Sequence, residues 1–408
     1  MIPIKESYQH PYSVTIRLAV FGLIVGLMTG GLTTLFGRVL LWIGEWRTSH
    51  LSALLPFLGL AGLVIVFLYQ HFSKEAQKGM ALVFEVAHGE DRKIPSSLIP
   101  LVILSTWLTH LFGGSAGREG VAVQLGAAIS HQFDRFFTFP KHEQVILVTG
   151  MAAGFAGLFQ TPLAALFFAL EVLAIGQLQL YALLPALVTV YTASSFSHLL
   201  GLEKFTHVIV TTPELTVSVF VKYILLGLFF GLTGNAFISL QQYLKKQALH
   251  YLPNPYWRIT IIGLMLSLAI SLAHFGRYAG LGTNLIEQSF SNQQIYSYDF
   301  LLKLLFTTIT LAAGFQGGEV TPLFAIGASL GVILAPFFGL PVELVAAAGY
   351  ISVFASATNT LLAPILIGGE VFGFHHLPFF TITVIISYQF NRKQSIYGLQ
   401  QALVIDVE

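Results

Sequence analysis

The stretch Gly113-Gly114-Ser115-Ala116-Gly117-Arg118-Glu119-Gly120-Val121, followed directly by the apolar run 122–129, decides how the rest of the chain is interpreted. Its glycines let the backbone approach a ligand closely. The run behind it predicts a helix whose first N–H groups lack intrahelical partners, and such a helix start binds anions. Because Glu119 lies in the same stretch, we expect a carboxylate to compete with a dissolved anion for these amides.

The composition is that of an integral membrane protein. Of 408 residues, 55% are hydrophobic and 10% are charged, whereas a soluble domain carries roughly 25% charged residues. The net charge of +1 argues against a role with nucleic acid, and the absence of cysteine excludes disulfides, thiolate metal sites and cysteine nucleophiles. Glu119 is therefore expected near bilayer depth, where an ionisable side chain is costly and usually functional.

Twelve apolar stretches predict an all-α polytopic membrane protein. A spanning helix needs ~20 residues, but several stretches are shorter or are interrupted, as at Pro162, Pro322 and Pro364. Such interruptions are typical of the discontinuous helices that meet near the midplane of transporters; twelve ordinary spans are the alternative. The stretches are 18–46, 51–70, 97–113, 121–130, 144–175, 178–201, 217–241, 258–275, 299–314, 320–338, 341–368 and 377–389.

Charged residues gather between the apolar stretches, as at Lys245-Lys246 and Arg392-Lys393. Basic residues mark cytoplasmic loops, and the polar segment 1–17 lacks the apolar region and cleavage site of a signal peptide. We therefore expect a multi-pass protein of the cell membrane with both termini in the cytoplasm. No long linker divides the chain, so residues 1–408 are predicted to form one transmembrane domain without a regulatory domain.

An internal repeat relates the two halves of the chain, with offsets of 199 to 201 residues. Halves of this kind, approximately 15–205 and 215–405, commonly pack as an inverted pair with the substrate site between them. Chance similarity of helices rich in small residues is the alternative. The matched segments are 126–127 with 327–328, 150–171 with 349–370, and hence 117–121 with 318–322.

The second copy of the opening motif is Gly318-Glu319-Val320-Thr321-Pro322. Two helix N-termini that converge would replace part of the hydration of an anion with backbone N–H groups. A carboxylate in a low dielectric readily takes up a proton when another anion arrives. Glu119 and Glu319 thus meet the requirement for coupling anion flux to proton flux, unless each simply pairs with Arg118 or with a buried backbone donor.

These motifs resemble the CLC family of anion channels and proton-coupled antiporters over roughly residues 15–405. The resemblance implies a homodimer, a separate pore in each subunit, and many tilted helices in two inverted halves. Glu119 then takes the place of the external gating glutamate of the family, whose side chain occupies an anion site and swings out when protonated. The matching segments are 117–120, 318–322, 150–171 and 349–371.

Departures from the chloride-handling members resemble the fluoride-exporting branch, the CLC-F fluoride/proton antiporters. Val121 follows the first motif where the others have proline. Residues 77–81, Gln-Lys-Gly-Met-Ala, stand where they have a serine-bearing loop, and Val172 stands where chloride antiporters have an internal proton glutamate. Glu319 and Thr321 replace apolar residues.

The resemblance also implies a fluoride site. Fluoride is small and strongly hydrated, so its site must supply strong donors, such as a protonated Glu319 and the Thr321 hydroxyl. Met80 is the signature residue of the branch, and Tyr397 matches the pore tyrosine that opens the last helix. Plain packing of the methionine and an interfacial tyrosine are the alternatives. Aromatic ring edges carry partial positive charge, so two phenylalanines near the loops are predicted to line the path unless they only pack or face lipid. The predicted anion-binding residues are Met80, Phe84, Gly117, Arg118, Gly120, Val121, Gly318, Val320, Phe324 and Tyr397, with Glu119, Glu319 and Thr321 carrying the proton or the anion.

The sequence thus predicts a homodimeric fluoride/proton antiporter that uses no cofactor and no metal and is not an enzyme. A chloride/proton antiporter or chloride channel is the main alternative, and a passive channel is the next. Residues 113–117 also fit the Gly-x-Ser-x-Gly pattern of serine hydrolases, with Ser115 as nucleophile and His110 as base, but no carboxylate to orient the histidine is evident. His375-His376 is interpreted as a loop pair, and no His/Asp/Glu cluster has the spacing of metal ligands.

Overall fold

A computed structural model describes residues 12–90, 93–291, 293–391 and 394–401 of the chain. Within these residues all regular structure is helical, and the only β pairing consists of three isolated bridges. The α-helices are α1 (Tyr12–Ser49), α2 (Leu51–Leu54), α3 (Leu58–Phe72), α4 (Met80–Ala87), α5 (Leu98–Leu111), α6 (Glu119–His131), α7 (His142–Phe159), α8 (Pro162–Glu171), α9 (Leu183–Leu199), α10 (Val217–Tyr251), α11 (Pro255–Leu272), α12 (Thr283–Phe290), α13 (Asp299–Ala313), α14 (Val320–Phe338), α15 (Val342–Thr358), α16 (Leu362–Phe372) and α17 (Leu377–Tyr388). Short 3-10 helices are η1 (Leu55–Phe57), η2 (Glu75–Lys78), η3 (Asp134–Phe136), η4 (Leu180–Ala182), η5 (Phe374–His376) and η6 (Gln389–Asn391).

The helices confirm a multi-pass membrane protein with interrupted spans. In the described part of the chain, six helical segments are long and apolar enough to cross a bilayer, and several apolar helices of 10–17 residues are not. The stretch 144–175 divides into α7 and α8, and 341–368 divides into α15 and α16. Twelve ordinary spans are therefore the wrong interpretation.

Two left-handed residues cause these divisions. Gln160 ends α7 with φ of 55°, and Asn359 ends α15 with φ of 51°. The three prolines singled out in the sequence stand in the first turns of α8, α14 and α16, where the missing N–H has no intrahelical acceptor to lose. They mark helix starts rather than kinks. The eight-residue helices α4 and α12 were not predicted, because they are too short to form apolar stretches.

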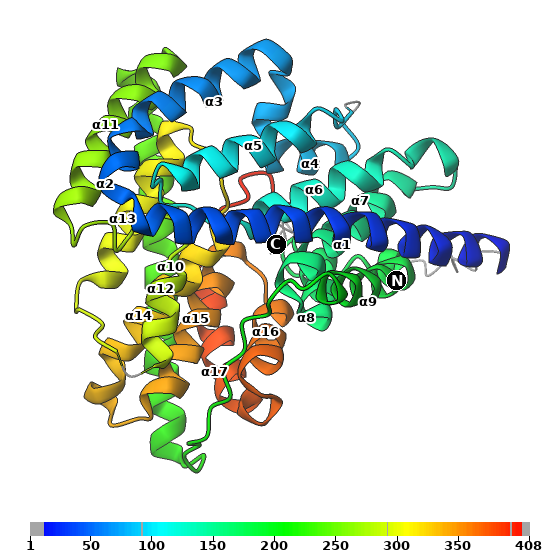
Figure 1. Cartoon of the computed structure of the whole chain (residues 1–408). Coiled ribbons are helices and arrows are strands. Elements are labelled where there is room, and N and C mark those ends of the chain that lie inside the picture. The colour runs from blue at the N-terminus through cyan, green and yellow to red at the C-terminus, as the bar shows by residue number, and fades with distance from the viewer. Residues whose placement is uncertain (1–11, 91–92, 292, 392–393, 402–408) are drawn as a thin grey trace, which may run out of the picture.

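The core contact of each half is a close crossing of two helices at glycines. A Cβ on Gly126 of α6 would lie 1.9 Å from the carbonyl oxygen of Gly150 in α7, and one on Gly327 of α14 would lie 2.1 Å from that of Gly349 in α15. The two pairs occupy matching positions of the repeat. Figure 1 shows α4 to α7 together in one part of the molecule and α14, α15 and α17 in another, with the long helices α1 and α10 running in crossing directions.

Three predictions concern residues outside the described ranges. These are most of the polar lead-in 1–17, the basic pair Arg392-Lys393, and residues 402–408 of the last helix that Tyr397 is predicted to open; residues 397–401 are described and form a turn rather than a helix.

Candidate anion site

The two glycine-rich motifs meet, as predicted from the repeat. The Gly117 amide donates to the Gly318 carbonyl at 2.5 Å, and the Gly318 amide donates back to the Gly117 carbonyl at 2.8 Å. A Cβ on Gly117 would lie 2.8 Å from Cδ of Pro322, so only glycine permits this approach. The starts of α6 and α14 are thereby brought together.

Glu119 reaches from the start of α6 to the start of α14. Its side chain is 1% exposed. Its Oε2 atom accepts hydrogen bonds from the Thr321 amide at 3.1 Å, from the Thr321 hydroxyl, and from the Arg118 amide at 3.3 Å. A helix N-terminus favours negative charge, so the carboxylate occupies a position suited to an anion. The sequence left open that Glu119 simply pairs with a buried backbone donor. It does so, but the donor is the Thr321 amide at the N-terminus of α14, which is the predicted anion position.

Arg118 brings further donors to the same place. Its Nε forms an ion pair with Oε1 of Glu119 at 3.7 Å, which is longer than a hydrogen bond, so the alternative in which Glu119 pairs with Arg118 is met in part. Among the described residues, neither Nε nor Nη1 of Arg118 has a hydrogen-bond partner, nor has Oε1 of Glu119, although all three atoms are buried. Buried polar atoms are normally hydrogen-bonded, so this guanidinium has unused capacity beside the carboxylate.

Glu319 stands at the N-cap of α14 and is turned toward α10. Its Oε1 accepts a hydrogen bond from Nε2 of Gln241 at 3.2 Å. Its Oε2 would lie 3.9 Å from a Cβ on Gly120, so this carboxylate adjoins the first motif. Gln241 was not predicted, because the local sequence around a polar residue in a helix does not identify the helix against which it packs.

The aromatic residues form a row across the protein interior. Ring centroids are 5.1 Å apart for Phe324 and Phe354, 6.1 Å for Phe354 and Phe168, 6.3 Å for Phe168 and Tyr397, and 5.4 Å for Tyr397 and Phe84. Phe84 and Phe324 are buried and Tyr397 is 6% exposed. None of the three side chains is therefore exposed to lipid. Phe168 and Phe354 were not predicted.

Of the remaining predicted residues, Val121 and Val320 stand at the two helix starts, whereas Met80 does not. Val121 and Val320 are buried apolar residues in the first turns of α6 and α14. Met80 is partly buried and opens α4 behind Gly79, whose φ is 56°. A Cβ on Gly79 would lie 3.2 Å from Oε1 of Gln124 in α6. The methionine loop therefore approaches α6 beyond the first turn that Glu119 opens.

A lysine that the sequence analysis missed supports the first motif from behind. Lys303 of α13 is fully buried, and its Nζ donates to Oγ of Ser115 at 2.9 Å and to the Gly280 carbonyl at 2.7 Å. Both ring nitrogens of His110 contact carbonyl oxygens, those of Thr106 and Ala116, at 2.8 and 2.9 Å. Neither nitrogen is left for Ser115, which removes the geometric basis of the hydrolase alternative.

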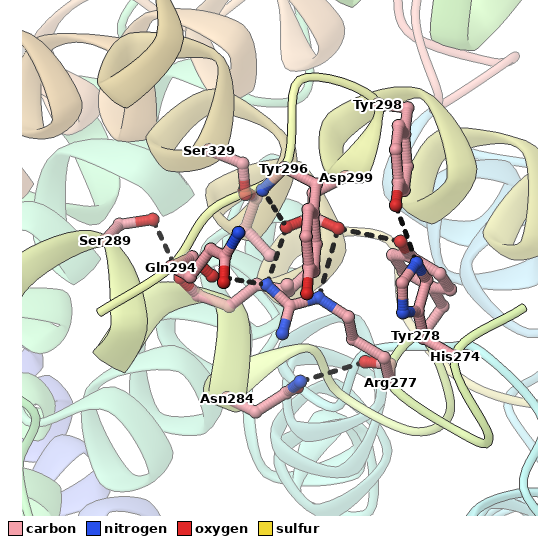
Figure 2. Close-up of polar contacts among 12 residues, drawn as sticks. His274, Arg277, Tyr278, Asn284, Ser289, Gln294, Tyr296, Tyr298, Asp299 and Ser329 are labelled. Carbon is pink, nitrogen blue, oxygen red and sulfur yellow. Dashed lines mark hydrogen bonds and ion pairs between the residues drawn. The ribbon is translucent and has the colours of Figure 1, made fainter.

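The loop that Lys303 contacts is held by a buried ion pair (Figure 2). Arg277 donates through Nε and Nη2 to the two carboxylate oxygens of Asp299, at 3.0 and 2.6 Å. The Tyr278 hydroxyl and the Tyr296 amide donate to the same carboxylate at 2.7 and 2.9 Å. The charge of Asp299 is thus fully compensated, as a buried charge requires, and this cluster acts as a clamp at the start of α13.

Two further carboxylates cross between the halves. Glu171, at the end of α8, accepts from the amides of Leu361, Leu362 and Ala363 at the start of α16, at 3.0, 3.1 and 2.8 Å. In matching positions, Glu370 of α16 accepts from the amides of Leu163 and Ala164 in α8, at 3.2 and 2.9 Å. The sequence analysis used both residues only as landmarks of the repeat.

Replacing Glu171 with glutamine is expected to lower stability by about 2 kcal/mol, because the glutamine amide has one accepting oxygen instead of two and leaves a buried amide of α16 without a partner. Thermal unfolding of the purified protein measures the change. Glu287→Gln, at an exposed position, is the control and should stay within about 0.5 kcal/mol. Equal stability of the two variants would contradict the capping role.

His375 and His376 lie in the short helix η5 rather than in a plain loop, and only His376 has a buried role. His376 is buried, and its Nε2 contacts the Ile209 carbonyl at 3.2 Å. It therefore fastens η5 to the segment before α10.

Comparisons with known proteins agree with this architecture. Residues 61–392 match the family model described as voltage gated chloride channel. A protein of Pseudomonas syringae pv. tomato, named chloride/fluoride channel protein, is 36% identical over 394 residues, which cover 94% of this chain and 86% of the relative. The crystal structure of a CLC-type fluoride/proton antiporter is similar with a TM-score of 0.95 at 52% identity, covering 97% of this chain and all of that chain. A slow cyanobacterial Cl⁻/H⁺ antiporter shares the fold at 20% identity, with a TM-score of 0.80 and coverage of 94% and 95%.

Proposed function

The chain belongs to the voltage-gated chloride channel family, the CLC family, and on this basis we propose that it exports fluoride across the cell membrane in exchange for protons. The similarity to a fluoride/proton antiporter at 52% identity supports the choice of ions. In this proposal the protein is a secondary transporter and not an enzyme, and it needs no cofactor.

The position of Glu119 carries the proposal. One oxygen of its carboxylate accepts hydrogen bonds from the Thr321 amide, the Thr321 hydroxyl and the Arg118 amide. These are donors that a fluoride ion also requires. Protonation removes the negative charge of Glu119 and weakens its hold on this position, so that fluoride takes its place. When fluoride departs, Glu119 releases its proton, which we propose that Glu319 receives, and the charged carboxylate returns to its position. Each cycle therefore moves an anion and a proton in opposite directions.

Arg118 and Glu319 extend the proposed path on either side of this position. The Nε and Nη1 atoms of Arg118, which have no hydrogen-bond partner among the described residues, supply charged donors to an arriving anion. Glu319, held by Gln241 at 3.2 Å, is proposed to receive the proton or to donate to fluoride when protonated. We propose that Met80, Phe84, Phe324 and Tyr397 form the apolar and aromatic wall, and that edges of the aromatic rings face the anion.

We further propose a homodimer of two inverted-repeat subunits, with both termini in the cytoplasm. The cross-capping by Glu171 and Glu370 and the matched glycine crossings support the repeat boundaries of approximately 15–205 and 215–405.

Simultaneous recording of fluoride and protons from fluoride-loaded proteoliposomes tests the function. We expect fluoride efflux down the fluoride gradient to drive protons inward against the proton gradient. Chloride at the same concentration should drive little proton movement. Comparable chloride and fluoride fluxes would favour the chloride transporter instead. Fluoride flux without uphill proton movement would favour a passive channel, the function that the name of the Pseudomonas relative suggests for that protein.

A further inference from the structure

The turn between α6 and α7 gathers side chains that ligate metals. The sequence analysis found no cluster with metal-ligand spacing, but η3 folds Asp134 back against the start of α7. Ligand atoms of Asp134, His142 and Glu143 there lie within 4.8 Å of one another. We name these three residues the α6–α7 cluster.

The ring orientation of His142 leaves an unexplained contact. Its Nδ1 lies 2.8 Å from the Phe139 carbonyl oxygen, which only accepts, so Nδ1 carries a proton. In the neutral ring Nε2 then bears a lone pair. This atom faces Oδ1 of Asp134 at 3.3 Å. Two acceptors in contact require a cation between them or a second proton on the ring.

The neighbouring basic residues do not resolve this contact. Oδ1 of Asp134 is buried and has no hydrogen-bond partner among the described residues. The guanidinium of Arg135 lies over the ring of Phe136 at 4.9 Å, and the ammonium of Lys141 lies over the ring of Tyr181 at 5.6 Å. Both cations are thus directed to aromatic rings rather than to the carboxylate.

The last turn of α6 adds a second imidazole. Nδ1 of His131 is buried and likewise has no hydrogen-bond partner within the described part of the chain. Its nitrogens are not among the ligand atoms that lie within 4.8 Å of one another, so His131 borders the α6–α7 cluster rather than belonging to it. A nitrogen donor with a free lone pair and two carboxylates provide the mixed ligand set that divalent transition metals prefer.

We propose that the α6–α7 cluster binds a divalent transition metal through its three residues, with zinc as the best fit. Zinc ligands at about 2.0–2.1 Å in a tetrahedron lie about 3.3 Å apart, which is the separation of Nε2 and Oδ1. A ligating histidine commonly donates its other N–H to a backbone carbonyl, as His142 does. The metal joins the end of α6, which begins at Glu119, to the start of α7. The proposal does not depend on which anion is transported.

Titration calorimetry on the full-length protein without an affinity tag, after chelator treatment, tests the site with zinc. We expect about one equivalent to bind, and His142→Ala to weaken binding at least about tenfold. His207→Ala is the matched control, because His207 is 26% exposed, against 27% for His142, and lies 3.4 Å from a single carboxylate, that of Glu343. It should bind zinc like the wild type. Cobalt should give the absorption spectrum of a tetrahedral site that His142→Ala abolishes.

An imidazolium of His142 paired with Asp134, with no metal, predicts the opposite result. The wild type and His142→Ala would then bind zinc equally, and this outcome overturns the proposal. Equal losses in His142→Ala and His207→Ala overturn it as well, because they indicate adventitious surface binding. Asp134→Asn, which preserves side-chain volume, provides the same comparison if His142→Ala does not fold.

Discussion

Replacing Glu119 with glutamine abolishes proton movement driven by fluoride. The glutamine amide cannot be protonated and carries no charge, so it neither transports a proton nor competes as an anion for the start of α14. Loss of coupling should be complete, down to the proton leak of liposomes without protein. Fluoride-selective and pH electrodes in one proteoliposome experiment measure both fluxes.

The control for this variant is Glu45→Gln, at an exposed position in α1, which should retain wild-type coupling. Thermal unfolding should show that Glu119→Gln is folded, because the substitution preserves volume. Proton-coupled fluoride efflux that persists in folded Glu119→Gln would refute the gating role. Loss of coupling in both variants would point to a defect unrelated to the site.

Replacing Gly126 with alanine disrupts the packing on which the site depends. The added Cβ would lie 1.9 Å from the Gly150 carbonyl oxygen and 2.8 Å from the Gly154 amide nitrogen. Both are backbone atoms that cannot rotate away, so α6 and α7 must separate. We expect the free energy of unfolding to fall by about 3 kcal/mol or more. Size-exclusion chromatography should then show little monodisperse protein, and the unfolding temperature should be lower.

Gly44→Ala is the matched control for this loss. Gly44 is also helical, in α1, and a Cβ there meets nothing within 4 Å. Alanine favours a helix over glycine by about 1 kcal/mol at most, so this variant should be as stable as the wild type or more stable. Gly327→Ala in the second half should behave like Gly126→Ala. A stable Gly126→Ala protein would contradict the described crossing of α6 and α7.

Several features of the fold followed from local sequence alone. The scarcity of charge indicated a membrane protein, and the prolines indicated that some helices are interrupted, although only the structure showed that they stand at helix starts. The meeting of the two glycine-rich motifs, which the structure shows in the hydrogen bonds between Gly117 and Gly318, was predicted because the internal repeat aligns these motifs. These predictions succeeded because composition, proline geometry and internal alignment are properties of the chain itself.

Other features depended on which helices meet. Glu171 caps α16 and Glu370 caps α8, although each lies about 200 residues from its partners. Lys303 reaches Ser115 from α13, and Gln241 reaches Glu319 from α10. A lysine or glutamine within an apolar helix shows only that it requires a partner.

Hydrophobicity, glycine and proline were enough to predict the class of protein, the two halves and the carboxylate at their meeting point. The donors that satisfy Glu119, the chain segments that Lys303 supports and the approach of Asp134 to His142 emerged from the folded chain alone. Helix packing selects these partners through contacts between segments that no local pattern connects. The identity of a residue specifies the interaction that it needs, and the fold specifies the atom that provides it.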